Sequence, residues 1–201
     1  MDDFKHGDKD ADGNNIGITF EFVNTFDEIP FSFNEEHNNY KNSFIADFLN
    51  NDVFNLFDKR ASRYMKSVYK CTNVGDGTSG SGSSAGYLEP VLSKVFPISL
   101  KELNAEAYIE KATTEHASEY TYEFPYAIEE ESGRDGNTGA YAYYKNAELP
   151  SLVKTNVNGT AVPYWTRSPE VESYVWVWHI NKDGEIGDPD YEGIGAYDEQ
   201  I

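Results

Sequence analysis

The sequence predicts an α+β fold, with a few short helices early in the chain and antiparallel strands late. Three observations predict it. Apolar residues recur at helical spacing in residues 42–57. Apolar and polar residues alternate in residues 16–23, as in a half-buried strand. The pair Asp183-Gly184, a hairpin signal, separates two segments with the composition of strands.

Composition and net charge limit the class of protein to which the chain can belong. The chain has 201 residues, of which 39% are hydrophobic, and this is enough for one domain with a core. Its net charge is −19, from 35 acidic and 16 basic residues. Such a charge argues against binding a nucleic-acid backbone and against docking on, or inserting into, an anionic membrane. It favours solubility, cation binding or a basic partner.

The chain divides into an acidic N-terminal arm or linker, residues 1–15, and a single domain, residues 16–201. The single cysteine, Cys71, allows no disulfide within the chain. The start of the chain is acidic and polar, so it does not resemble a secretory signal peptide. We therefore expect synthesis in the cytosol, with any extracellular or virion location reached by another route such as phage lysis.

The first half is predicted to hold two strands and two helices. In residues 16–23 the apolar side chains share one face of a strand, and a second short strand is expected at 29–33. Ser43 is the expected N-cap of the helix in residues 42–57. Asp58 is expected to cap a shorter helix that leads into an extended segment.

The middle of the chain holds a loop and one further strand. Residues 75–86 are rich in Gly and Ser, and we interpret them as a long hairpin excursion rather than a domain boundary. Residues 95–100 have the composition of a buried strand. Ser99 is the expected cap of a short helix at 101–104.

The last third is predicted to consist of strands. They are expected at residues 140–145, 164–169 and 174–180, followed by a turn at 181–184 and a return strand from Glu185. In residues 174–180 both faces are largely apolar, which is typical of a central strand covered on both sides.

Several motifs resemble one known family. They follow one another along the chain: the helix Ser43–Asn50, VFPIS at 95–99, YAYYK at 141–145, YWTRSP at 164–169 and INKDGEI at 180–186. In this order they resemble the DUF6273 family of phage and Firmicutes proteins. That family is similar to C-type-lectin-like and formylglycine-generating-enzyme-like folds. The resemblance therefore implies a C-type-lectin-like domain with antiparallel strands and a few short helices.

The sequence departs from the family pattern at two places. Phe48 stands where the helix motif usually has Trp, and the end, 193–201, lacks an Arg-Pro pair. Arg167 lies inside the YWTRSP motif, where it has two interpretations. It binds a ligand carboxylate, or it pairs with an acidic residue and holds the turn before Pro169. We favour the structural role.

The acidic arm contains the start of a calcium loop. Asp8, Asp10 and Asp12 alternate and are followed by Gly13, so Ca²⁺ is the candidate cofactor. The twelfth position of the loop is Thr19 instead of a bidentate Glu. A solvated acidic arm is therefore the favoured interpretation.

Enzymatic chemistry is not expected. The four histidines show no metal-ligand spacing, and the Gly/Ser segment contains no proper serine elbow. Acidic pairs are numerous, but none is singled out as the carboxylate pair of a glycosidase.

Aromatic residues near the C-terminal end form the candidate ligand site. Tyr174, Trp176 and Trp178 lie on one face of the predicted strand, where their rings are either core or a platform for a sugar or a protein loop. Flanking polar contacts are expected from Glu170, Glu172, Asp188, Asp190 and Tyr191.

The sequence thus predicts a non-enzymatic recognition domain. The resemblance implies a phage or prophage tail or receptor-binding protein that contacts a bacterial cell-surface glycan or protein. The alternative is a structural virion component of a tail, baseplate or capsid, without a ligand of its own. Other virion proteins are expected partners, and assembly as a homo-oligomer stays open.

Overall fold

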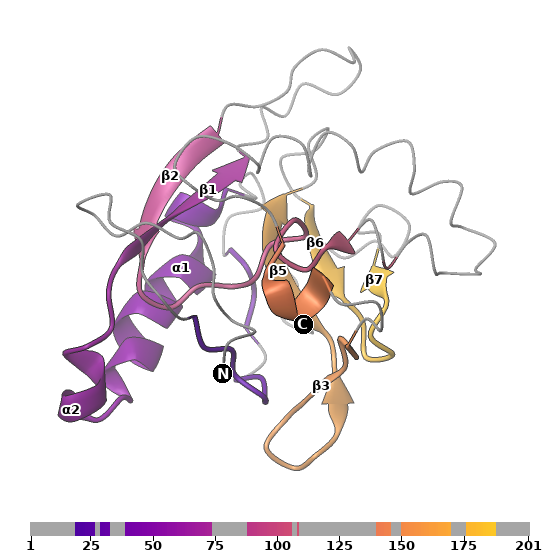
Figure 1. Ribbon diagram of the computed structural model, residues 1–201, viewed down its shortest axis with the longest axis horizontal. Coiled ribbons are helices and arrows are strands. Elements are labelled where there is room, and N and C mark those ends of the chain that lie inside the picture. Colours follow the sequence, from indigo (N-terminus) through magenta and orange to yellow (C-terminus); the bar gives the residue numbers. More distant parts are fainter. Residues whose placement is uncertain are drawn as a thin grey trace.

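The structure is a computed structural model that describes residues 19–26, 29–32, 39–73, 88–105, 108, 140–145, 150–169 and 176–187. In this part the chain is α+β, as predicted, with short helices and small antiparallel sheets. Figure 1 shows the helices of residues 40–62 and the hairpin of β1 (Val68–Asn73) and β2 (Leu88–Ser93) on one side of the molecule. The sheet of β5 (Tyr164–Pro169), β6 (Val177–Ile180) and β7 (Ile186–Gly187) lies on the other. Among the described residues, no helix has the length and apolar character needed to cross a membrane.

The helical segment begins with the 3-10 helix η2 (Tyr40–Asn42) and continues through α1 (Phe44–Phe48) and the π-helical segment η3 (Leu49–Val53). The short helix α2 (Lys59–Ser62) follows. The predicted helix in residues 42–57 is therefore confirmed, and its widening into a π-helical turn was not foreseen.

The predicted caps of the first two helices are confirmed. Ser43 Oγ accepts a hydrogen bond from the Ala46 amide at 3.2 Å, and so satisfies one of the free donors of the first turn. Asp58 Oδ1 accepts from the Arg60 amide at 2.7 Å at the start of α2.

Asn50 links the π-helical segment to the chain at residues 94–95. Its amide nitrogen donates to the carbonyl oxygens of Ala46 and Val95, both at 2.9 Å. Its amide oxygen accepts from the backbone amides of Lys94 at 2.8 Å and Val95 at 3.3 Å. The side chain thus fixes the position of Lys94 against the helix.

The strands form three sheets. β1 (Val68–Asn73) pairs with β2 (Leu88–Ser93), and β3 (Lys154–Thr155) pairs with β4 (Ala161–Val162). The pairing of β1 with β2 confirms that the Gly/Ser-rich segment connects two strands of one hairpin. Residues 74–87 themselves lie outside the described part.

The third sheet has the order β5 (Tyr164–Pro169), β6 (Val177–Ile180) and β7 (Ile186–Gly187), all antiparallel. As predicted, β6 is central and buried on both faces. Val177 belongs to a core cluster under the helices, whereas Trp178 and Ile180 belong to a second cluster on the other side. The alternation of side chains along β6 therefore separates two apolar cores.

Two of the strand predictions are wrong. In both segments, contacts with distant parts of the chain decide the backbone conformation instead of the local pattern of apolar residues. In 19–23 no strand forms, and Phe20 is 77% exposed. Asn24, which follows this segment, forms an isolated parallel bridge with Thr155. Residues 140–145 contain the 3-10 helix η4 (Ala142–Lys145). Tyr141 and Tyr144 are both buried, and a spacing of three places them on one side of a helical turn but on opposite sides of a strand.

Two further predicted strands also do not form, and both segments are buried but irregular. Residues 29–32 are not a strand, although Phe31 is fully buried and its carbonyl accepts from the Ile45 amide at 3.1 Å. Residues 95–99 also lack strand pairing, because Pro97 has no amide to donate to a ladder. Ser99 does cap the turns that follow, since its Oγ accepts from the Glu102 amide at 3.2 Å.

Two hairpin turns have the same construction. In 156–160 and in 181–185 an asparagine side-chain oxygen accepts from the backbone amides two and four residues further on, at 3.0–3.1 Å. The fourth residue of each is a glycine with positive φ, Gly159 at 79° and Gly184 at 81°. The predicted turn at 181–184 is therefore confirmed.

The two turn glycines provide a matched pair of substitutions. Gly159→Ala is expected to lower the free energy of unfolding by about 1–2 kcal/mol, because an alanine is strained at positive φ. Gly184→Ala should cost more, since its Cβ would lie 2.9 Å from Val153 Cγ2 and 3.1 Å from the Val153 amide nitrogen. At Gly159 the added Cβ meets nothing within 4 Å. Urea denaturation of both variants measures the difference, and equal losses would contradict this packing of the second turn.

Candidate functional site

The described surface contains a cleft of about 1370 Å³. Several parts of the chain line it: residues 19–26 and 29, the helical segment and the residues after it up to Val68, residues 94–98, Tyr141 and Tyr144, and the segment around β3 to β5. Aromatic side chains are prominent in its lining, among them Phe20, Phe22, Tyr64, Phe96, Tyr144 and Trp165.

Residues 19–26 form one wall of the cleft, which we call the N-terminal wall. Glu21 anchors it, since Lys154 Nζ lies 2.7 Å from Glu21 Oε1 and the Tyr144 hydroxyl donates to Glu21 Oε2 at 2.6 Å. Lys154 also donates to the Phe22 carbonyl at 2.7 Å. The carboxylate, the ammonium and the phenol are thus engaged with one another rather than free for chemistry.

Three tyrosines near this wall are held in their protonated form. Burial raises the pKa of Tyr144 well above its ordinary value, and the negative charge of Glu21 raises it further. Burial likewise raises the pKa values of Tyr164 and Tyr108. Tyr164 donates its hydroxyl hydrogen to the Leu152 carbonyl at 3.0 Å. These phenols therefore act as hydrogen-bond donors at neutral pH.

The ionisable side chains of the cleft are mostly basic. In the described part of the chain, they are Lys66, Lys94, Lys154 and Glu21, so three positive charges face one negative charge and the sum is +2. Lys94 Nζ lies 4.2 Å from the centroid of the Phe54 ring, a cation–π geometry. The cleft thus differs in sign from the chain as a whole, whose net charge is −19.

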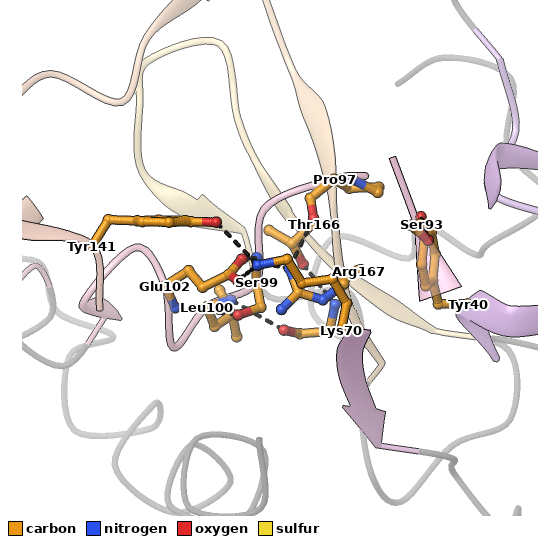
Figure 2. A network of polar contacts seen from close by, with 11 residues as sticks. Tyr40, Lys70, Ser93, Pro97, Ser99, Leu100, Glu102, Tyr141, Thr166 and Arg167 are labelled. Atoms are coloured by element: carbon orange, nitrogen blue, oxygen red, sulfur yellow. Dashed lines mark hydrogen bonds and ion pairs between the residues drawn. The ribbon is translucent and has the colours of Figure 1, made fainter. Parts of the chain in front are cut away.

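Figure 2 shows a buried ionic cluster, which contacts residues of the cleft lining. We call Lys70, Glu102 and Arg167 the buried triad, and all three are fully buried. Lys70 Nζ donates to Glu102 Oε1 at 2.8 Å, and Arg167 Nη1 donates to Glu102 Oε2. The Ser99 amide donates to Glu102 Oε2 at 3.0 Å, which completes a reciprocal capping box.

The buried triad supports the cleft wall. Lys70 Nζ donates to the Tyr141 hydroxyl at 3.1 Å and lies 4.2 Å from the centroid of the Phe96 ring. Tyr141 and Phe96 both line the cleft. The triad is buried and joins β1, β5 and the turn after Ser99, so it holds these rings in place.

The WTRSP motif is framework, as predicted. Arg167 pairs with Glu102 and donates to the Pro97 carbonyl at 2.9 Å, which is the structural role we favoured. Thr166 Oγ1 donates to the Trp178 carbonyl at 2.6 Å, and Ser168 Oγ accepts from the Leu100 amide at 3.1 Å. The pairing register between β5 and β6 shifts within this stretch. Such an irregularity changes the direction in which the side chains of a strand point.

The predicted aromatic platform needs correction at Trp178. This ring is 1% exposed and belongs to the second core cluster, so it offers no surface to a ligand. Trp176, directly before β6, is half-buried. The remaining predicted ligand residues lie outside the described part of the chain: Glu170, Glu172, Tyr174, Asp188, Asp190 and Tyr191.

The predicted calcium residues Asp8, Asp10 and Asp12 also lie outside the described part. Within the described ranges, no group of three or more His, Cys, Asp or Glu side chains is arranged to hold a metal ion.

Sequence reasoning missed the cleft, Lys70 and Glu102. One signal was present for Glu102, because Ser99 and Glu102 have the S-x-x-E spacing of a capping box. Lys70 also interrupts a strand of otherwise apolar and neutral residues. The cleft had no such signal, because its walls come from segments that are distant in sequence.

Comparison with known proteins gives one match. A family model described as "Domain of unknown function (DUF6273)" matches residues 17–196. No curated protein and no solved structure matches the chain.

Proposed function

The chain belongs to the DUF6273 family, and for this member we propose a non-enzymatic recognition domain that binds its ligand in the cleft. The observation that carries the proposal is the cleft itself, which is open, lined by aromatic rings and edged by exposed apolar side chains. Phe20 is 77% exposed, Tyr64 71% and Val157 83%, and all three line the cleft. Exposed apolar side chains that gather at one site favour an interaction surface.

The size of the cleft favours a ligand larger than a metabolite. Pockets for small molecules usually enclose about 300–1000 Å³. The cleft, at about 1370 Å³, exceeds that range. It therefore suits a segment of a polymer, such as a chain of a glycan or of a protein.

The polar groups of the cleft favour binding over catalysis. Glu21 is paired with Lys154 and accepts from Tyr144, so its carboxylate is not placed as a free base. The raised pKa of Tyr144 keeps the phenol protonated. These groups serve to anchor the N-terminal wall.

We further propose a C-type-lectin-like fold and a virion location for this domain. The support is the family resemblance, together with an α+β arrangement that places a helical segment beside small antiparallel sheets. On this basis the ligand is a bacterial cell-surface glycan or protein, and the domain is part of a phage or prophage tail or receptor-binding protein.

Substitution of the rim side chains tests the proposed site. Phe20→Ala, Tyr64→Ala and Val157→Ala should each weaken binding by about 5- to 30-fold, as expected for anchors worth about 1–2 kcal/mol. Stability should change little, because these side chains are already exposed. The measurement is binding of the fluorescently labelled chain to intact bacterial cells, to a glycan array and to a peptide array.

Leu56→Ala is the matched control, since Leu56 is also 77% exposed but does not line the cleft. It should bind like the wild type. If the three rim variants also bind like the wild type, the cleft is not the recognition site.

A further inference from the structure

We infer that the ligand of the cleft is an acidic, apolar peptide segment of a partner protein, whose carboxylates bind Lys66 and Lys94. The inference rests on the proposed function and names the chemical class of its ligand. It depends on two independent features of the cleft, namely its apolar floor and its local charge.

The floor of the cleft is apolar. Ile45, Leu49, Val68 and Val95 line it and are buried among other apolar residues. A sugar ring placed against such a floor loses hydrogen bonds between its hydroxyl groups and water without gaining others. Apolar side chains of a peptide lose no hydrogen bonds there and remove apolar surface from water. The floor therefore favours a peptide over a glycan.

The charge of the cleft selects an acidic peptide. Among the described residues, its ionisable lining sums to +2, in a chain whose net charge is −19. Charges elsewhere on the surface act weakly inside the cleft, because the Debye length is about 8 Å at physiological ionic strength. The lysines that line the cleft are much closer to a bound segment, so they set the sign of the charge it meets.

Lys66 and Lys94 are the two lysines available for this contact. Lys154 is already paired with Glu21 at 2.7 Å. In the part of the chain that the structure describes, neither Lys66 nor Lys94 forms an ion pair with a carboxylate. The backbone of Lys94 is held by Asn50, and its ammonium group lies over the Phe54 ring, so its position is set before a ligand binds.

A peptide array with the full-length chain tests this class of ligand. Three sets of peptides of equal length combine Phe and Leu with Glu, with Gln or with Lys. We expect the wild type to bind the Glu set at least about tenfold more tightly than the Lys set, with the Gln set between them. Added salt should weaken binding to the Glu set.

The decisive variant is Lys66→Glu with Lys94→Glu, and its control is Lys59→Glu with Lys145→Glu. Both pairs change the net charge equally, and the control lysines are exposed and lie outside the cleft lining. We expect the first pair to abolish or reverse the preference for the Glu set. We expect the second pair to retain it.

Three results would overturn the inference. The wild type shows no preference among the three sets of peptides, or both pairs of variants lose binding equally. The third is that a glycan binds more tightly than any of the peptides. These results differ from failure of the proposed function. If Phe20→Ala weakens binding to cells or glycans while the lysine variants do not, the cleft remains the recognition site and the acidic peptide class is wrong. If neither kind of variant changes any binding, both proposals are wrong.

Discussion

Glu102→Gln is expected to lower the free energy of unfolding by about 3–5 kcal/mol. Glu102 is fully buried and accepts hydrogen bonds from Lys70, from Arg167 and from the Ser99 amide. Glutamine has nearly the same shape but no charge, so two buried cations would lose their shared carboxylate. Removing one partner of a buried ion pair is costly because the remaining charge stays out of water. Urea denaturation at neutral pH measures the loss.

Two further variants sharpen this test. Asp183→Asn removes an exposed carboxylate that pairs with Lys182 at 3.1 Å, and stability should stay close to that of the wild type because solvent screens this pair. The triple variant Lys70→Met, Glu102→Leu and Arg167→Met removes all the charges of the buried triad. It should lose less stability than Glu102→Gln does. If Glu102→Gln is as stable as the wild type, the carboxylate does not hold the triad together.

Trp178→Ala is expected to lower the free energy of unfolding by about 3–5 kcal/mol. The ring lies in the core cluster with Leu100, Leu152 and Ile180, and the substitution leaves a large cavity that the neighbours fill only in part. Trp176→Ala should cost less, because Trp176 is half-buried. Thermal and urea denaturation of the two variants give the comparison.

Substitutions of Trp178 also distinguish a role in the core from a role as a platform for a ligand. Trp178→Phe keeps most of the apolar volume, so this variant should fold and bind cells or peptides like the wild type. If Trp178→Phe loses binding without losing stability, Trp178 belongs to the ligand site, as predicted from the sequence. Trp178→Ala is expected to lose binding only to the extent that the chain unfolds.

Predictions made from local patterns were correct where a short stretch of sequence decides the structure. Ser43 and Asp58 cap helices because their side chains reach backbone amides of the next turn. The turn at 181–184 forms because Asn181 and Gly184 supply the side-chain acceptor and the positive φ that it requires. Such interactions span only a few residues, so they can be predicted without the rest of the fold.

Predictions failed where a partner from a distant segment decides. Alternation in residues 16–23 predicts a strand, but Phe20 lies exposed at the edge of a cleft. The aromatic cluster at 140–145 also has the composition of a strand. It forms a 3-10 helix that buries Tyr141 and Tyr144 on the same side. A pattern of apolar residues indicates that these side chains need to be buried. It does not indicate which distant segment covers them.

The sequence by itself determined the α+β class, the helix caps, the hairpins, the central position of the strand at Val177–Ile180 and the structural role of Arg167. Tertiary structure alone decided which charges meet, since Lys70, Glu102 and Arg167 are far apart in the chain. It also decided that the ring of Trp178 is core and that the exposed rings edge a cleft elsewhere. The physical reason is that burial and ion pairing depend on contacts between distant segments, whereas caps and turns depend on adjacent residues.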